Sequence, residues 1–200
     1  EFNVRVGKFI TPAGIWNVDH GSPTIMTVRQ PYQTSYLSIF PESQTGAQVF
    51  GKTQFQDQDF SYAGWVSTGR GTSDAFSQAD YGQVPQDLDD WSLGSHLQAD
   101  LDLPHDVATR FGGSFHTGTV RYQTEWLELV PTGPTTSDMA DITTLVLDSI
   151  YAREYCYGLD SKIEWKGFLL QGEWNHRKML NLLDNESETD VNAWYVLAAK

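Results

Sequence analysis

Basic residues are scarce in this 200-residue chain. Lysine and arginine together number 13, against 26 aspartates and glutamates, which gives a formal net charge of -13. Binding to nucleic acid needs a basic footprint that neutralises phosphates, so this charge balance argues against nucleic acid as a partner. Cysteine is nearly absent as well. With Cys156 alone, the chain has neither a disulfide framework nor a cluster of thiolate metal ligands.

Long apolar runs are also missing. No stretch approaches the roughly 20 apolar residues of a transmembrane helix, and the first residues lack the basic start and apolar middle of a signal peptide. In a soluble protein these absences would indicate the cytoplasm. That inference does not apply to membrane β-strands, because they alternate lipid-facing apolar residues with lumen-facing polar ones. Aromatic residues, in contrast, make up 13% of the chain, which excludes a disordered acidic polypeptide.

The strongest local pattern is a period of two in residues 91–101. Apolar Trp91, Leu93 and Leu97 alternate there with polar His96 and Gln98, which predicts a strand with one apolar face. Residues 103–106 have the composition of a tight turn. Residues 107–117 then alternate again, so the two segments predict a β-hairpin.

Six further segments behave like strands: residues 2–9, 45–55, 60–68, 143–157, 161–175 and 193–200. We therefore expect an all-β chain, residues 1–200, folded as one domain with eight antiparallel strands in up-and-down order. A sustained helical period is absent. Residues 179–183 have the composition for no more than a turn or two of helix in a loop.

The predicted connections alternate in length. Residues 56–59, 103–106 and 158–160 form short connections, whereas residues 10–44, 69–90, 118–142 and 176–192 form long ones. Short turns at one rim and long loops at the other are typical of outer-membrane barrels. Aromatic residues gather at the predicted strand ends, where they would form interfacial girdles, although aromatics favour strands in any β core. They are Phe2, Phe9, Phe55, Phe60, Trp91, Tyr155, Tyr157, Trp174, Trp194 and Tyr195.

Residues 7–17, Gly-Lys-Phe-Ile-Thr-Pro-Ala-Gly-Ile-Trp-Asn, resemble the Gly-Lys-Phe-x-x-Pro-x-Gly segment that recurs in Gram-negative porins, including phosphate-selective porins of the O/P type. Residues 168–174, a polar loop and residues 193–197 are similar to the family's strand-loop-strand pattern. The resemblance implies a transmembrane β-barrel of about sixteen strands around an aqueous channel. The eight strands here would be half of it, a porin-like domain incomplete at both ends. A complete eight-stranded barrel, acting as an anchor or adhesin, is the alternative.

The function that this resemblance implies is passive diffusion of small hydrophilic solutes or ions across the outer membrane. It implies no enzymatic activity and no cofactor, and its partners are outer-membrane lipid and the solutes; a homotrimer fits the family, and the sequence leaves the oligomeric state open. Phosphate selectivity calls for rings of lysine or arginine, whereas this chain is acidic. We therefore expect a general or cation-favouring pore.

If the apolar side chains of each strand face lipid, the polar side chains that alternate with them line the pore. The same alternation also fits the solvated face of a soluble sheet. The long connection at residues 10–44 is expected to fold inward as a constriction loop carrying Arg29. The predicted pore-lining residues are Gln48, Lys52, Gln54, His96, Gln98, Asp100, Arg110, Ser114, His116, Gln171 and Glu173.

A different class of function is a secreted all-β carbohydrate-binding or glycoside hydrolase domain with a sandwich or jelly-roll core. Its carboxylate pair would come from Glu125 with Glu128, or from Glu173 with an aspartate, but chance pairs are expected among 26 acids. The histidines lack the spacing of a zinc motif. Cys156 has no evident catalytic partner, so we interpret it as a small packing residue.

Overall fold

The computed structural model describes residues 1–19, 39–56, 58–68, 91–129, 142–181 and 188–200. The elements are β1 (Asn3–Ile10), α1 (Gly14–Asp19), β2 (Ser43–Phe55), β3 (Gln58–Thr68), β4 (Trp91–Leu103), β5 (Val107–Leu129), β6 (Ile142–Trp165), β7 (Phe168–Asn181) and β8 (Glu188–Ala199).

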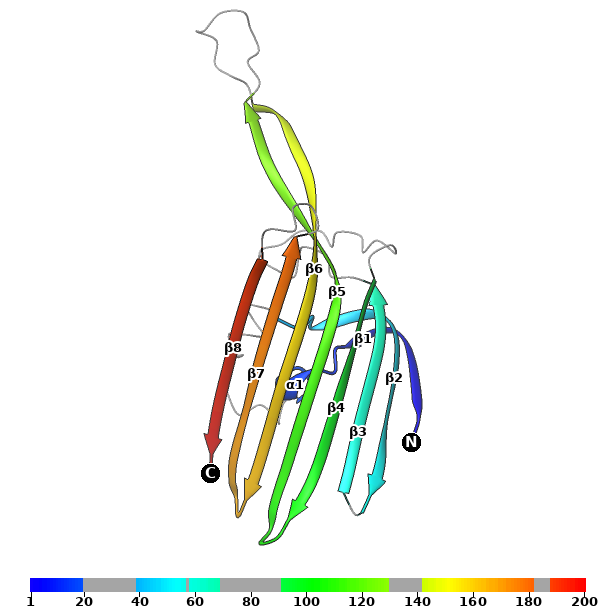
Figure 1. Cartoon of the computed structure of the whole chain (residues 1–200), viewed down its shortest axis with the longest axis vertical. Coiled ribbons are helices and arrows are strands. Elements are labelled where there is room, and N and C mark those ends of the chain that lie inside the picture. Colours follow the sequence, from blue (N-terminus) through cyan, green and yellow to red (C-terminus); the bar gives the residue numbers. More distant parts are fainter. Residues whose placement is uncertain (20–38, 57, 69–90, 130–141, 182–187) are drawn as a thin grey trace, which may run out of the picture.

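The eight strands form a single sheet in which each strand pairs with the next one along the chain (Figure 1). Every pairing is antiparallel. The predicted all-β class, the number of strands and the up-and-down order are therefore confirmed. Consecutive antiparallel strands need only tight turns between them, which explains why local alternation was enough to find them.

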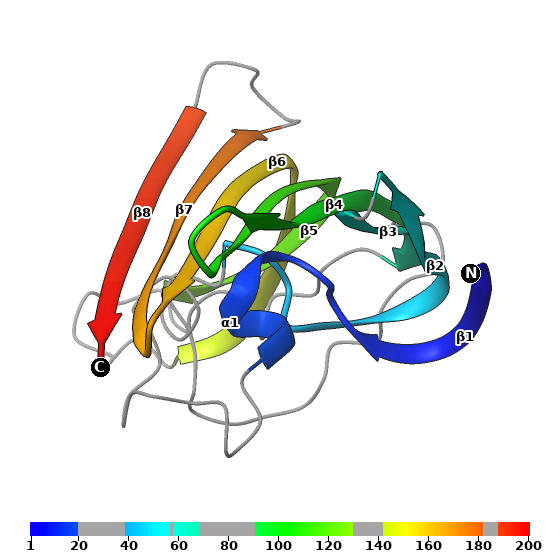
Figure 2. The same cartoon turned by 90° about the horizontal axis from the view of Figure 1, so that it is seen from below.

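The sheet is open. Among the described residues it is not closed into a barrel, and β1 and β8 are its two edges. It is strongly curved nevertheless. Viewed from below, the strands bend around α1, which lies on the concave side (Figure 2). We call this concave side the inner face and the opposite side the outer face.

One predicted turn is wrong. Residues 158–160 lie within β6, where Gly158 and Asp160 pair with Asn175 and Glu173 of β7. The β6–β7 turn falls at Lys166 and Gly167 instead, and both have positive φ values, 47° and 82°. Two consecutive positive φ values define the type I′ turn of a two-residue hairpin. Placing the turn at a glycine that in fact lies inside a strand shifted the predicted boundary.

The predicted loop at residues 118–142 is also largely wrong. Strands β5 and β6 remain paired as far as Leu129 and Ile142, and this hairpin projects beyond the ends of the other strands (Figure 1). Strand β7 continues to Asn181 and β8 begins at Glu188, so the predicted loop at residues 176–192 is largely wrong and residues 179–181 are not helical. Residues 182 and 183 lie outside the described residues.

The first long connection contains an element that sequence reasoning missed. Helix α1 begins at Gly14, whose φ is 70°, directly after Thr11, Pro12 and Ala13. In the part of the chain that the structure describes, no helix has the length and apolar character needed to cross a membrane.

Candidate functional site on the inner face

The outer face is apolar, and no other described element covers it. Every large hydrophobic strand residue with an exposed side chain lies on this face, as the cross-strand register shows. These residues are Val4, Val6, Ile10, Val49, Phe55, Val66, Trp91, Leu93, Leu97, Leu103, Phe111, Tyr157, Leu159, Trp165, Phe168, Leu170, Trp174, Trp194 and Val196. So large a contiguous apolar surface marks a contact with lipid or protein.

The inner face has the opposite character. Of the buried polar and charged residues on the strands, all but Thr109 lie there: Gln44, Gln48, Ser67, Ser92, His96, Ser114, His116, Glu154, Asp160, Glu173, Asn175 and Arg177. A soluble antiparallel sheet normally buries its apolar face and exposes its polar one. This sheet does the reverse.

The structure brings all eleven predicted pore-lining residues to the inner face, namely Gln48, Lys52, Gln54, His96, Gln98, Asp100, Arg110, Ser114, His116, Gln171 and Glu173. They do not form one cluster. His96, Ser114, His116 and Glu173 are buried, and Ser114 and Glu173 bond the start of α1, whereas Lys52 and Gln54 are exposed. Arg29 lies outside the described residues.

Two parts of the first connection cover the middle of the inner face. Helix α1 and the preceding residues form one part, and residues 39–42 form the other. The Thr11 amide donates to the Glu42 carbonyl over 3.0 Å, and the Asn17 side-chain amide donates to the carbonyls of Thr11 and Glu42 over 2.6 and 3.4 Å. These bonds tie the two parts together as one covering segment.

Glu173 of β7 holds the start of α1 against the sheet. Its Oε1 accepts the Trp16 amide over 2.6 Å, and the Ile15 amide bonds to the same carboxyl group. The first amides of a helix have no partner within the helix, so a buried acceptor is stabilising there. The Tyr195 hydroxyl donates to Oε1 from β8 over 3.0 Å. The amide of Gly14, the first residue of α1, donates to Ser114 Oγ over 3.3 Å.

Gly14 is required at this contact. A Cβ atom there would lie 2.8 Å from Glu173 Oε2, and the φ of 70° disfavours any other residue. The glycine therefore allows the chain to approach the carboxylate closely. This gives a physical reason for the second glycine of the Gly-Lys-Phe-x-x-Pro-x-Gly segment in this chain.

A second buried group lies farther along the inner face. His116 Nε2 and Glu154 Oε1 are 3.2 Å apart, and each side chain is 1% exposed. The Trp65 ring stacks on the His116 ring with centroids 6.4 Å apart. Beside them the Cys156 thiol donates to the Ile39 carbonyl over 3.0 Å. Cys156 is fully buried, as expected of a packing residue, and the covering segment is what buries it.

Gly94 makes room for the Trp65 ring. It lies between Trp65 and His116 in the register, and a Cβ on it would come within 2.3 Å of the indole. We expect Gly94→Ala to destabilise the protein by about 1–3 kcal/mol, because a packed site resists overpacking. Urea unfolding measures the change. Gly113→Ala is the matched control, since its Cβ would meet only Leu159 at 3.9 Å on the outer face; equal losses in both variants would contradict this packing role.

Sequence reasoning missed Glu154, Asp160, Asn175 and Arg177 on the inner face. Because the turn was predicted at residues 158–160, the alternation in β6 was interrupted there. The even-numbered residues of β6 were therefore not assigned to the inner face. The Lys-Gly pair at residues 166 and 167 was the available signal, because glycine at the second position favours a type I′ turn. Arg177 lies opposite Cys156 in the register.

The carboxylate pairs considered for hydrolysis gain no support from the geometry. Asp160 lies opposite Glu173, but both are buried and α1 occupies the space over Glu173. The side chains of Glu125 and Glu128 lie outside the described residues. Among the described residues, no three or more histidine, cysteine, aspartate or glutamate side chains lie together where they could hold a metal ion.

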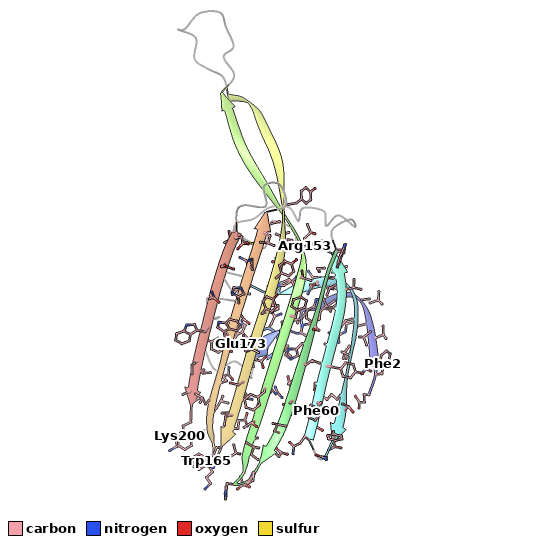
Figure 3. All side chains as sticks on the ribbon, in the orientation of Figure 1. Phe2, Phe60, Arg153, Trp165, Glu173 and Lys200 are labelled. Carbon is pink, nitrogen blue, oxygen red and sulfur yellow. The ribbon has the colours of Figure 1, made fainter. Side chains whose placement is uncertain are left out.

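The outer apolar surface has different borders at its two ends. Toward the long loops lie Arg153 and the ion pair of Lys178 with Glu188, whose Nζ and Oε2 are 2.9 Å apart. Toward the short turns lie the stacked rings of Trp165 and Phe168. Figure 3 shows Arg153 and Trp165 near these opposite ends of the sheet.

Lysines flank the aromatic border. Lys166 Nζ lies 5.2 Å from the Trp165 ring centroid, and Lys200 Nζ lies 4.9 Å from that of Phe168. Aromatic rings with adjoining lysines are typical of the interface between lipid and water. Four predicted girdle residues are misplaced, however. Trp174 and Trp194 lie opposite each other in the middle of β7 and β8 and not at strand ends. Phe9 is buried, and Tyr195 bonds Glu173, so both belong to the inner face.

Comparison with known proteins finds no family model that matches this chain, and no curated protein or solved structure similar to it.

Proposed function

We propose that this chain forms part of the wall of an outer-membrane porin, through which small hydrophilic solutes or ions diffuse passively. The observation that carries the proposal is the inverted distribution of side chains. An apolar outer face that no described segment covers is suited to lipid, and a polar, charged inner face is suited to water in a lumen.

The dimensions of the apolar surface support the proposal. About ten residues separate Tyr155 from Trp165 on β6, which is roughly 33 Å of strand. At the strand tilt of outer-membrane barrels this length spans roughly 25 Å, the height of their apolar band. Charged Arg153 lies just beyond it on the same face.

The alternative is a secreted carbohydrate-binding or hydrolase domain with a sandwich core. In such a domain the apolar face of the sheet packs against a second sheet. The described residues form one sheet, and the covering segment lies on its polar face. The inverted faces therefore favour the porin over the sandwich.

Closure of the barrel is part of the proposal. In a bilayer the free backbone groups of the β1 and β8 edges need partners, so both edges are expected to pair with further strands, in a barrel of about sixteen. The covering segment would then lie inside the lumen and narrow it, as expected for the connection at residues 10–44.

Charge on the inner face favours a pore that prefers cations. Among the described side chains, the acidic residues there are Asp59, Asp100, Asp102, Glu154, Asp160, Glu164 and Glu173, and the basic ones are Arg5, Lys52, Arg110, Lys162 and Arg177. The excess of two carboxylates comes from buried residues of this set, and the chain as a whole carries a formal net charge of -13. An acidic excess lowers the barrier to cations and raises it for anions.

The test is to purify the full-length gene product and measure its conductance in planar bilayers. We expect a detergent-requiring protein with a heat-dependent shift on a gel, single-channel steps, and a reversal potential that indicates cation preference in a salt gradient. A product that is soluble in buffer and shows no heat-dependent shift would exclude the porin. Clear anion preference would exclude only the charge argument.

A further inference from the structure

Two buried carboxyl groups lie opposite each other where α1 meets the sheet. Asp160 of β6 and Glu173 of β7 are direct partners in the register, so their Cβ atoms are about 5 Å apart. Their side chains are only 6% and 5% exposed. Like charges in directly opposite positions destabilise a sheet, and a buried charge is costly unless it is paired. The position therefore calls for a positive charge or for the loss of one negative charge.

The contacts of Glu173 fit a carboxylate better than a neutral acid. The group accepts hydrogen bonds from the amides of Trp16 and Ile15 and from the hydroxyl of Tyr195. The Asn175 side-chain amide donates to its other oxygen, Oε2, over 3.5 Å. A neutral acid would have to place its own hydrogen among these donors, and donors of this kind favour the charged form. Glu173 lies about midway along β7 (Figure 3).

Asp160 lacks partners of this kind. Its Oδ2 is buried and has no hydrogen-bond partner among the described residues. The side chain lies over Gly112, where a Cβ atom would come within 2.3 Å of Oδ2, so this glycine makes room for the carboxyl group. A proton on Oδ2 would find no acceptor, and an ionised Oδ2 finds no donor. The described residues therefore satisfy neither form of Asp160, and a buried polar atom of this kind indicates a missing ligand.

The basic side chains nearest to Asp160 in the register are engaged elsewhere. Arg110 lies diagonally opposite Asp160 on β5, and Lys162 lies two residues farther along β6. Arg110 Nε is 2.7 Å from Asp100 Oδ1, and Lys162 Nζ is 2.7 Å from Glu164 Oε1. Arg110 attracts Asp160 only from a distance. Within the described ranges, no ion pair includes Asp160.

We propose that a small monovalent cation, sodium or potassium, binds between Asp160 and Glu173 and stabilises the covering segment against the sheet. Carboxylate oxygens are the ligands that hard cations prefer. A calcium ion takes about six to eight oxygen ligands, whereas the described part of the chain contains no group of three or more metal-ligating side chains. Two carboxyl groups therefore favour a monovalent ion.

The cation is coupled to the covering segment through Glu173, because this carboxyl group also accepts the first amides of α1. Detachment of the segment exposes both carboxyl groups to water, where they hold a monovalent ion only weakly. A ligand that binds one state stabilises that state by mass action. Sodium should therefore lower the fraction of molecules in which the segment is detached. The inference goes beyond the proposed function and does not depend on conduction.

The experiment measures maleimide labelling of Cys156 in the purified full-length protein in detergent, while sodium chloride replaces N-methylglucamine chloride at constant ionic strength. The Cys156 thiol is covered at Ile39, so labelling reports detachment. Labelling is expected to slow about fivefold between zero and about 100 mM sodium, as for a Kd of about 25 mM. Asp160→Asn should abolish this dependence. Asp59→Asn, which removes the same charge from an exposed position on the inner face, should retain it.

Labelling of the unchanged protein that is equally fast in sodium and in N-methylglucamine overturns the inference, whether or not the variants fold. An equal sodium dependence in Asp160→Asn and Asp59→Asn overturns it as well. Conductance in planar bilayers tests the proposed function separately. A protein that conducts without sodium-dependent labelling remains a porin without this site, and one that shows the labelling effect but never conducts contradicts the porin alone.

Discussion

Replacing Leu97 by arginine is expected to destabilise the protein in a bilayer by roughly 2–4 kcal/mol, the cost of a basic residue near the lipid midplane of a barrel. Leu97 lies at the centre of β4 on the outer face, and 65% of its side chain is exposed. In a water-soluble protein the same change at so exposed a position would shift stability by about 0.5 kcal/mol or less. The size of the effect therefore reports what covers the outer face.

Gln98→Arg is the matched control, because Gln98 is the next residue on β4 and faces the inner side. It is expected to change stability by no more than about 0.5 kcal/mol, since a polar lumen accepts a charge. Urea unfolding from lipid vesicles, followed by tryptophan fluorescence, measures both variants. Similar small effects from the two would show that the outer face does not contact lipid.

Replacing Glu173 by leucine is expected to release the covering segment from the inner face. The change removes the acceptor of the Trp16 and Ile15 amides, and a buried amide without an acceptor costs about 1–3 kcal/mol. The fraction of molecules with the segment detached should rise by roughly 5- to 150-fold. Cys156 reports this detachment, because it is the single cysteine and its thiol is covered at Ile39.

The measurement is the rate at which a water-soluble maleimide labels Cys156. Glu173→Leu should accelerate labelling and raise the single-channel conductance, and Glu173→Gln, which keeps an acceptor oxygen, should lie between it and the unchanged protein. Gln171→Leu serves as control, since Gln171 also bonds the Tyr195 hydroxyl but does not hold the helix. Labelling that is as slow in Glu173→Leu as in the control would show that other contacts hold the segment.

The arrangement of residues on the two faces was predictable because a strand has a side-chain period of two. Once Leu93 and Leu97 were assigned to one face, His96 and Gln98 had to lie on the other. The same rule placed Glu173 and Gln171 correctly even though the preceding turn was wrong, because both residues were assigned within a single alternating segment.

The covering segment was not predictable to the same degree. An inward fold of residues 10–44 was expected, but neither α1 nor its contact with Glu173 was. A six-residue helix has too few turns to give a periodic signal, and the contact joins residues 157 positions apart. Phe9 and Tyr195 were assigned to an aromatic girdle for a related reason: composition locates an aromatic near a strand end without showing which face it occupies.

The sequence by itself determined the all-β class, the number and order of the strands and the residues that share each face, because all of these follow from local alternation and short turns. Only the tertiary structure decided which face is covered, where β6 turns into β7, and which charged side chains meet across strands, as Arg110 and Asp100 do. Those features depend on strand register, on the curvature of the sheet and on contacts between distant segments. Local periodicity in the sequence contains no information about register, curvature or contacts between distant segments.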